Sequence, residues 1–498
     1  MREAQQTAGS VIFRRRPRRN PAPPVFFLCL SAFYLLALCL LAPPLPAEDS
    51  AEPDVAETDS GRLNTIRYGT ETEIAALIQS LRNEKTDTLD DALTGLAQNT
   101  HNRGILQGIF SFFAERGKSG LEDRAIRAVE ERDLENNETV ITALDYLGRL
   151  KAGSAVESLQ KLISTKERRF MVPAIRALGR VAGADRETAD QAAEYLSDYY
   201  STGEPPDEYR REIITALGET GSTRGIPFLK GIASNIEERA TLRMAALDAL
   251  SKIGDDEALP VIISAVSDDD PNVRSSAIAA LGPFTGEEVN RAILEAFRDS
   301  YYRVRLGAAQ ASRRGKLEAA VPYLKFRAER DDVPQVRDEA IRALGEIESP
   351  GTYEILRALF EDRHSPAPVR IRSAEMLVMR DTGACVEKLI AELDDAKSRN
   401  QTALYNGFLS IIGGARSDKL EALARRLLGS ADILEKSYAL DMAANNNFRG
   451  MTEDIRSLTE NRNAGLARKA RTILGKLEEG ADPGSSAPGN QPSPPQTE

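Results

Sequence analysis

Residues 267–282 read SDDDPNVRSSAIAALG, and this stretch decides the fold because it recurs. An acidic cluster and a proline lead into Val273-Arg274, and Leu281 follows that arginine by seven residues. An apolar residue before an arginine, usually with a leucine seven positions later, returns every 31 to 33 residues. The arginines of this series are Arg210, Arg243, Arg274, Arg305, Arg337 and Arg370. A fixed period of about 20 to 50 residues is the signature of a stacked repeat array.

An acidic residue recurs in step with the arginines. Six residues before each arginine stands Glu204, Glu237, Asp268, Asp299 or Asp331, and His364 takes this place in the sixth copy. Weaker copies continue the period on both sides, at YLG 146–148 and ALG 177–179 upstream and at IIG 411–413 and ILG 473–475 downstream. The array is therefore expected to span residues 62–478 with roughly a dozen units.

Each unit reads as two helices. Pro271 suits the first turn of a helix, and the acids before it suit the helix N-terminus. Val273, Ala277, Ile278 and Leu281 recur at helical spacing, and Gly282 suits a helix stop. A second apolar stripe runs through EEVNRAILEAFRD, residues 287–299. Because no segment of 62–478 alternates like a strand, we expect an all-α solenoid, a superhelix of stacked two-helix repeats.

The pattern DVPQVRDEAIRALG at 332–345 resembles the HEAT-repeat solenoids, especially the short bacterial type related to phycobilisome-lyase repeats. The resemblance implies that the recurring acids and arginines form a ladder of hydrogen bonds between neighbouring repeats. The ladder residues would be Asp268, Asp299, Asp331, Arg210, Arg243, Arg274, Arg305, Arg337 and Arg370. An arginine row that binds phosphates is the alternative, and the acid that accompanies each arginine favours the structural role.

The resemblance also places the arginine-bearing helix on the concave side of the solenoid. The residue five positions after the arginine should then face outward, into the concave surface. This set, called the concave row below, comprises Asp145, Arg176, Thr215, Asp248, Ala279, Gln310, Arg342 and Glu375. Its mixed charge suits a protein or peptide partner better than a cofactor or nucleic acid.

The N-terminal region has the features of an export signal. RRRPRRN at 14–20 precedes an uncharged run of 18 residues, Val25–Ala42, and Ala47-Glu48 is the preferred cleavage point. The run is also long enough to span a bilayer, so a retained membrane anchor is the alternative. A lipoprotein reading at Cys39 fits less well, because Leu38 is large. All three versions place the repeats outside the cytoplasm, in the periplasm or cell envelope.

Charge and cysteine content limit the possible functions. Loss of residues 1–47 removes six arginines and one glutamate, which lowers the formal net charge from −11 to −16. Nucleic acid is thus an unsuitable partner, because binding it requires neutralising phosphates. Cys385 would be the one cysteine of the processed chain and suits a buried position. The two histidines, His101 and His364, have no metal-ligand spacing.

We therefore expect no catalytic residues, no metal and no cofactor. The segment 48–61 is read as an acidic linker and 479–498 as a disordered Pro/Gly/Ser-rich tail. The sequence predicts an exported scaffold that binds protein partners through its concave face. A membrane-anchored assembly factor with the same repeats is one alternative, and a lyase-type enzyme on HEAT-like repeats is another.

Overall fold

The computed structural model describes residues 55–84, 86–203 and 205–479. The chain divides into two units, Met1–Arg62 and Leu63–Glu498. The expected export segment 1–47 lies outside the described residues, as does the expected tail beyond Glu479. Among the helices that are described, none is both long enough and apolar enough to cross a membrane.

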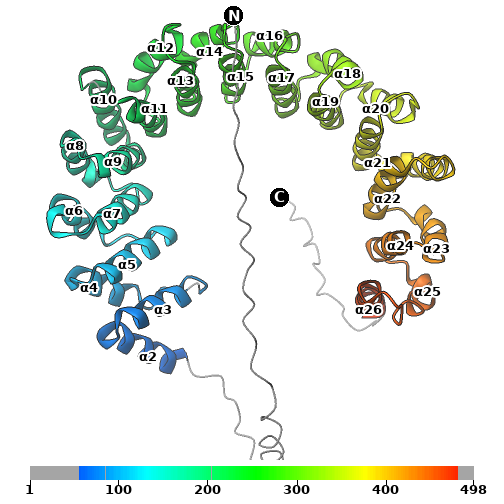
Figure 1. Ribbon diagram of the computed structural model, residues 1–498, viewed down its shortest axis with the longest axis horizontal. Helices are drawn as coiled ribbons and strands as arrows, with labels where there is room; N and C mark the ends of the chain where they lie inside the picture. The colour runs from blue at the N-terminus through cyan, green and yellow to red at the C-terminus, as the bar shows by residue number, and fades with distance from the viewer. Residues whose placement is uncertain (1–54, 85, 204, 480–498) are drawn as a thin grey trace, which may run out of the picture. The chain divides into compact units, whose positions relative to one another are not determined.

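Within the unit Leu63–Glu498, helices alternate between an outer and an inner layer (Figure 1). The outer helices are α4 (Asp90–Asn99), α6 (Glu122–Glu130), α8 (Val156–Ser164), α10 (Arg186–Thr202), α12 (Ile226–Ser234), α14 (Leu259–Ala265), α16 (Glu287–Ala296), α18 (Val321–Arg330), α20 (Thr352–Glu361), α23 (Glu421–Leu428) and α25 (Thr452–Arg456).

The inner helices are α3 (Glu71–Leu81), α5 (Arg103–Arg116), α7 (Asn137–Arg149), α9 (Arg168–Val181), α11 (Asp207–Thr220), α13 (Ala240–Ile253), α15 (Pro271–Ala280), α17 (Tyr302–Arg314), α19 (Pro334–Glu346), the first half of α21 (Ala367–Ser398), α22 (Thr402–Gly414), α24 (Ile433–Asn446) and α26 (Ala464–Glu479). Short 3-10 turns complete many connections: η1 (Arg132–Leu134), η2 (Gly153–Ala155), η3 (Thr223–Gly225), η4 (Asp256–Ala258), η5 (Glu318–Ala320), η6 (Asp418–Leu420) and η7 (Arg449–Met451).

The core of this unit is distributed along the stack. Successive inner helices pack against one another, and each outer helix packs on the inner helix that follows it. Every regular element of the described residues is helical. The predicted all-α solenoid is therefore confirmed.

The repeat around α15 shows how the sequence produces this arrangement. Asp270 is the N-cap, and its carboxylate accepts a hydrogen bond from the backbone N–H of Asn272 at 2.7 Å. Pro271 occupies the first helical position, where a missing N–H costs nothing. The apolar stripe is buried between the layers and comprises Val273, Ala277, Ile278 and Leu281.

Glycines near the ends of the inner helices allow close helix packing. A Cβ on Gly179 of α9 would lie 2.9 Å from the Cα of Ala216 on α11. A Cβ on Gly218 of α11 would lie 2.7 Å from the Cα of Ala249 on α13. Side chains at these positions would push neighbouring repeats apart, so the glycines set the spacing between inner helices.

The reading of this glycine as a helix stop is correct only for some repeats. Helix α15 ends at Ala280, two residues before Gly282. Gly179, Gly218 and Gly345 instead lie inside their helices. The sequence pattern alone does not distinguish a glycine that ends a helix from a glycine inside a helix that allows a neighbouring helix to pack closely.

Two other segments differ from expectation. The linker expected at 48–61 overlaps helix α2 (Val55–Tyr68), whose C-terminal half carries the buried Ile66. A helix anchored at one end extends readily, because each added residue adds one hydrogen bond. Helix α21 (Ala367–Ser398) is two helices joined at a kink at Asp381 (φ −156°, ψ 92°). The Asp381 carboxylate accepts from the Ala384 N–H at 3.0 Å and so caps the second helix.

A matched pair of glycine substitutions tests the close-packing role. We expect Gly218→Ala to destabilise the fold by about 1–3 kcal/mol, because a methyl group is forced against the α13 backbone. Gly231, inside α12, has no atom within 4 Å of an ideal Cβ. Gly231→Ala should be neutral or stabilising by up to about 1 kcal/mol. Guanidinium unfolding followed by circular dichroism measures both, and equal effects of the two changes would contradict this account.

Candidate functional site

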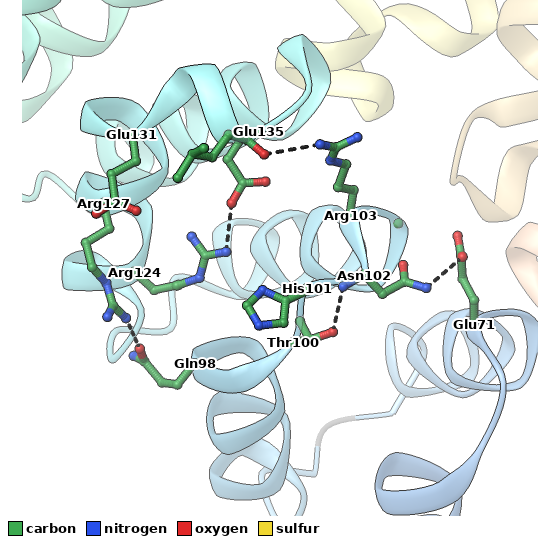
Figure 2. A pocket seen from close by; sticks show the side chains of 12 residues that line it. Glu71, Gln98, Thr100, His101, Asn102, Arg103, Arg124, Arg127, Glu131 and Glu135 are labelled. Atoms are coloured by element: carbon green, nitrogen blue, oxygen red, sulfur yellow. Dashed lines mark hydrogen bonds and ion pairs between the residues drawn. The ribbon is translucent and has the colours of Figure 1, made fainter.

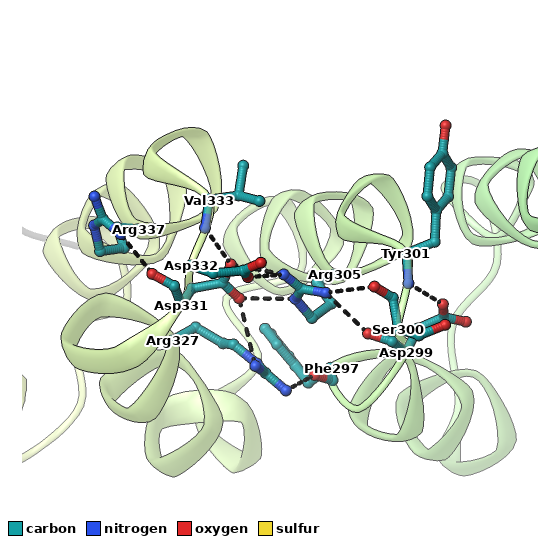
Figure 3. Close-up of polar contacts among 10 residues, drawn as sticks. All are labelled: Phe297, Asp299, Ser300, Tyr301, Arg305, Arg327, Asp331, Asp332, Val333 and Arg337. Carbon is teal, nitrogen blue, oxygen red and sulfur yellow. Dashed lines mark hydrogen bonds and ion pairs between the residues drawn. The ribbon is translucent and has the colours of Figure 1, made fainter.

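The centre of the predicted ladder is the pair Arg305–Asp331 (Figure 3). Arg305 lies on α17, and Asp331 lies in the turn between α18 and α19, one repeat further on. Nε and Nη2 of Arg305 donate to the two carboxylate oxygens of Asp331, each at 2.8 Å. The side chain of Asp331 is fully buried and that of Arg305 is 6% exposed. Two parallel, charge-assisted hydrogen bonds thus join adjacent repeats in the interior.

Arg305 and Asp331 also form hydrogen bonds with backbone atoms of the turns before α17 and α19. Nη1 of Arg305 donates to the carbonyl oxygens of Asp299 and Ser300, at 3.1 and 3.0 Å. Oδ1 of Asp331 accepts from the backbone N–H of Val333 at 3.0 Å, just before α19 begins. The arrangement is called the arginine–aspartate clamp below: it joins an inner helix, the turn before it and the turn before the next inner helix.

The clamp recurs in the two preceding repeats. Arg274 donates to both oxygens of Asp299 at 2.7 and 3.0 Å, and to the carbonyl oxygen of Asp268 at 2.8 Å. Arg243 donates through Nη1 alone to Asp268 at 2.5 Å. The structure therefore brings together three predicted pairs of arginine and aspartate in consecutive repeats.

Three predicted ladder arginines do not form this pair. Arg337 donates to the Asp331 carbonyl oxygen at 2.5 Å, and among the described residues it has no carboxylate partner. The next repeat offers His364 in place of an acid, which explains the interruption. Arg210 donates to the Pro205 carbonyl oxygen at 3.3 Å, while Glu237 of the following repeat is exposed.

Arg370 has a different buried partner. Its Nη2 donates to Glu392 at 2.7 Å and its Nε to the Phe360 carbonyl oxygen at 2.8 Å. The turn at 399–401 reads Arg-Asn-Gln and carries no carboxylate. The longer side chain of Glu392, on the second half of α21, reaches the same guanidinium instead.

Hydrogen bonding holds the carboxylates of Asp299 and Asp331 in the charged form. Burial of Asp331 raises its pKa, but the hydrogen bonds from Arg305 and from the Val333 N–H outweigh this effect, and the pKa lies below its ordinary value. The pKa of Asp299 is lowered in the same way, against its burial, by Arg274 and the Tyr301 N–H. The guanidiniums of Arg243, Arg305 and Arg370 are themselves buried, which leaves them little surface for a phosphate ligand.

The concave row lies on the inner helices, and none of its residues is buried. Its members are Asp145 on α7, Arg176 on α9, Thr215 on α11, Asp248 on α13, Ala279 on α15, Gln310 on α17, Arg342 on α19 and Glu375 on α21.

The N-terminal end of the concave row is occupied by ion pairs between inner helices. Asp145 accepts from Arg180 of α9 at 3.1 Å. Arg176 donates to both oxygens of Glu212 on α11, at 2.8 and 3.1 Å. These charged members of the row are already satisfied within the protein.

At the C-terminal end the row members Arg342 and Glu375 pair within their own helices, and an ion pair beside them joins α19 to α21. Asp338 of α19 accepts from Arg342 at 2.9 Å and from Arg372 of α21 at 2.6 Å, and Arg372 also pairs with Glu375. Arg313 of α17 donates to Glu339 of α19 at 2.7 Å.

The centre of the concave row lacks such pairs. Thr215 donates to the carbonyl oxygen of Arg211, and Asp248 pairs with Lys252 of its own helix at 3.2 Å. Within the described part of the chain, no ion pair along the concave row joins any two of the helices α11, α13, α15 and α17. The next two members of the row, Ala279 and Gln310, are uncharged. Among the described residues, Thr215, Asp248 and Gln310 therefore form no ion pair with a neighbouring inner helix.

The sequence analysis missed the partners Glu212, Asp338, Glu339 and Arg372. Glu212, Glu339 and Arg372 stand two positions after a recurring arginine. A sequence signal for these partners exists. In Arg176 and Glu212, a concave-row residue of one repeat and the residue two positions after the recurring arginine of the next repeat carry opposite charges.

Cys385, His101 and His364 are the described residues that the sequence singled out for their potential chemical reactivity. Cys385 is buried, its thiol donates to the Asp381 carbonyl oxygen at 3.2 Å, and burial raises its pKa to about 11. His101 and His364 are exposed. Within residues 55–84, 86–203 and 205–479, no group of three or more His, Cys, Asp or Glu side chains is placed to hold a metal ion.

Comparison with known families identifies the repeat. Residues 66–473 match the family described as spirochaete HEAT repeat protein. The chain belongs to this family. The matched span contains all the clamps and the whole concave row, so both are features of a HEAT-repeat protein.

More distant similarities are limited. A deoxyhypusine hydroxylase of Candida albicans is 28% identical over 137 residues, which are 28% of this chain and 41% of that protein. The crystal structure of Kap121p matches 90% of this chain and 56% of its own with 13% identity and a TM-score of 0.47. Human deoxyhypusine hydroxylase in complex with glycerol matches 47% of this chain and 98% of its own with 21% identity and a TM-score of 0.22. The chain spans less than half of the curated relative, and both TM-scores lie below 0.5.

Removal of one clamp partner should be costly. We expect Arg305→Ala to lower the free energy of unfolding by about 3 kcal/mol, because the buried Asp331 carboxylate loses its two-point partner and keeps only the longer contact with Arg327 at 3.4 Å. Arg298, in the turn after α16, is 62% exposed and pairs with Glu295 at the end of that helix. Arg298→Ala should cost less than about 1 kcal/mol. Chemical denaturation compares the two variants, and a clamp variant no weaker than this control would refute the stabilising role.

The lowered carboxylate pKa values also predict acid sensitivity. A depressed pKa in the folded state stabilises the fold above the ordinary aspartate value of about 4, and this stability is lost as the pH falls through the lower folded pKa. We expect the free energy of unfolding to decline below about pH 5 and to decline less steeply in Asp331→Asn. Unfolding curves across this range provide the measurement. If the free energy of unfolding declined as steeply with falling pH in Asp331→Asn as in the unmodified chain, Asp331 would not contribute to the acid sensitivity.

Proposed function

We propose that this HEAT-repeat protein is an exported scaffold that binds a protein or peptide partner across its inner helices. The observation that supports the proposal is the interruption of ion pairing along the concave row. Ion pairs between neighbouring inner helices lie at both ends of the row, whereas among the described residues none lies along the stretch from Thr215 to Gln310. We assign partner binding to this stretch, on α11, α13, α15 and α17.

The composition of the stretch favours a polypeptide. Thr215, Asp248 and Gln310 offer hydrogen-bonding groups of several kinds, and the small Ala279 leaves room for a side chain or backbone of a partner. The formal net charge of −11 opposes binding of nucleic acid, which depends on neutralising phosphates. Mixed polar contacts around small residues are compatible with peptide recognition, in which few side chains supply most of the binding energy.

The clamps support this division of roles. Arg243, Arg274 and Arg305 hold the inner helices from the side of the turns, within the interior. The repeats of the proposed binding stretch are therefore fixed relative to their neighbours without using side chains of the concave row. A surface held in one arrangement before binding loses less conformational entropy when the partner arrives.

Export is the second element of the proposal, and it rests on the N-terminal sequence. A basic segment, an apolar run and Ala47 follow one another in the order of a secretory signal. The proposed location is the periplasm or cell envelope. A retained N-terminal segment would give a membrane-anchored form with the same binding surface.

Bulky substitutions test the binding surface. We expect Ala279→Trp combined with Gln310→Trp to stay folded and to capture about a tenth or less of the partner taken from a cell-envelope extract by the unmodified chain. The matched control carries tryptophan at the exposed Arg291 and Lys325, on outer helices α16 and α18 of the same region. This control should retain the partner. Loss of capture in the outer variant but not in the inner one would exclude the concave row as the binding surface.

The export proposal has a direct test. Because the sequence favours cleavage after Ala47, the native protein should begin at or near Glu48 and fractionate outside the cytoplasm. Intact-mass measurement together with N-terminal sequencing of the native protein decides the point. A species that keeps residues 1–47 and sediments with membranes would support the anchored form, and a cytoplasmic full-length species would refute export.

A further inference from the structure

The first repeats contain a polar hollow that lies apart from the concave row. It has a volume of about 690 Å³ and lies where the turn between α4 and α5 meets α6 and the turn that follows α6. Charged side chains of both signs line it (Figure 2). The charged and imidazole groups are Glu71, His101, Arg103, Arg124, Arg127, Glu131 and Glu135.

Two of its arginines differ from their neighbours in the first repeats. Arg82, Arg116 and Arg132 each pair with a carboxylate one repeat away, at 3.1, 3.0 and 2.6 Å. Arg103 instead donates to the Leu134 carbonyl oxygen at 3.1 Å, and Arg127 donates to the amide oxygen of Gln98 at 2.8 Å. Both guanidiniums are thus oriented by neutral acceptors.

These arginines retain capacity for an anion. A guanidinium carries five N–H donors and stays charged at neutral pH, and neither Arg103 nor Arg127 forms an ion pair within the described residues. Arg124, the third arginine, is committed to Glu135 at 2.9 Å, and both of these side chains are largely buried. Arg124 is therefore a fixed part of the lining, and Arg103 and Arg127 are the two cations of the hollow without an ionic partner among the described residues.

The positions of the two cations indicate the form of the ligand. In Figure 2, Arg127 and Arg103 lie on opposite sides of the ring of His101. The two guanidiniums are held by different acceptors, the Leu134 carbonyl and the Gln98 amide, and an extended chain can present a carboxylate to each. Glu71, Glu131 and Glu135 oppose a multiply charged phosphate group in the same space. Glu71 and Glu131 also lack an ionic partner among the described residues and can accept peptide N–H groups.

We propose that this hollow binds an extended acidic peptide, with one carboxylate at Arg103 and another at Arg127. Carboxylate and guanidinium groups match in a planar, two-point geometry. Because the chain as a whole is acidic, long-range attraction does not assist such a peptide, and binding depends on local contacts. The site is separate from the concave row, so either proposal stands if the other fails.

Fluorescence anisotropy with a fluorescein-labelled peptide of three glutamates separated by glycines tests the site. We expect Arg103→Gln combined with Arg127→Gln to weaken binding by about tenfold or more, since each guanidinium contributes a charged hydrogen bond. The matched control, Arg291→Gln combined with Arg314→Gln, removes the same charge at exposed positions outside the hollow and should bind as the unmodified chain does. Thermal melts of both variants should coincide with that of the unmodified chain.

Two further binding measurements define the ligand. The peptide with glutamine in place of glutamate should bind about tenfold more weakly or worse, which assigns recognition to the carboxylates. Free glutarate at the peptide concentration should not displace the peptide. Equal binding of the glutamine peptide, or an unchanged affinity in the Arg103→Gln, Arg127→Gln variant, would overturn the proposal. Displacement by free glutarate would overturn the assignment to a peptide.

Discussion

The bidentate hydrogen bonds between an arginine of one repeat and an aspartate of the next are the constraint on which the centre of this protein depends. A solenoid has no central core, and each repeat is held only by its neighbours. In the pairs Arg274–Asp299 and Arg305–Asp331, a side chain of one inner helix fixes the turn that starts the next inner helix. The same aspartate accepts from a backbone N–H of that turn. One short side chain therefore holds the turn before an inner helix and sets the position of that helix relative to the preceding repeat.

Close packing and surface charge act together with the clamps. Gly179 and Gly218 bring inner helices together so closely that a methyl group would meet backbone atoms. At the surface above, Arg176 and Glu212 join two of these helices again. Apolar burial, interior clamps and surface ion pairs thus act at successive depths of the same interface. Where the surface pairs stop, the inner helices are still held by the two deeper layers, and this is the stretch to which we assign partner binding.

The sequence predicted the fold because the repeat period is a property of the chain itself. The spacing of Arg243, Arg274 and Arg305 placed the inner helices, and the acid six residues earlier indicated the ladder partner. The same pattern did not distinguish the roles of Gly218 and Gly282, because a helix end and a close helix approach both favour glycine. It also missed the partner of Arg370, since Glu392 reaches this arginine from the middle of the second half of α21, a position that the repeated acid does not mark. The hollow around Arg103 and Arg127 arises from turns of two different repeats and leaves no motif in the sequence.

A double-mutant cycle on Arg274 and Asp299 is the most direct test of the clamp as the central constraint. The cycle compares the free energies of unfolding of Arg274→Ala, Asp299→Ala and the double variant with that of the unmodified chain. The account predicts a favourable coupling of about 1.5–3 kcal/mol, because each single change leaves a largely buried charge unpaired whereas the double change removes both. A coupling within about 0.5 kcal/mol of zero would contradict it, and the stacking of the repeats would then rest on apolar packing alone.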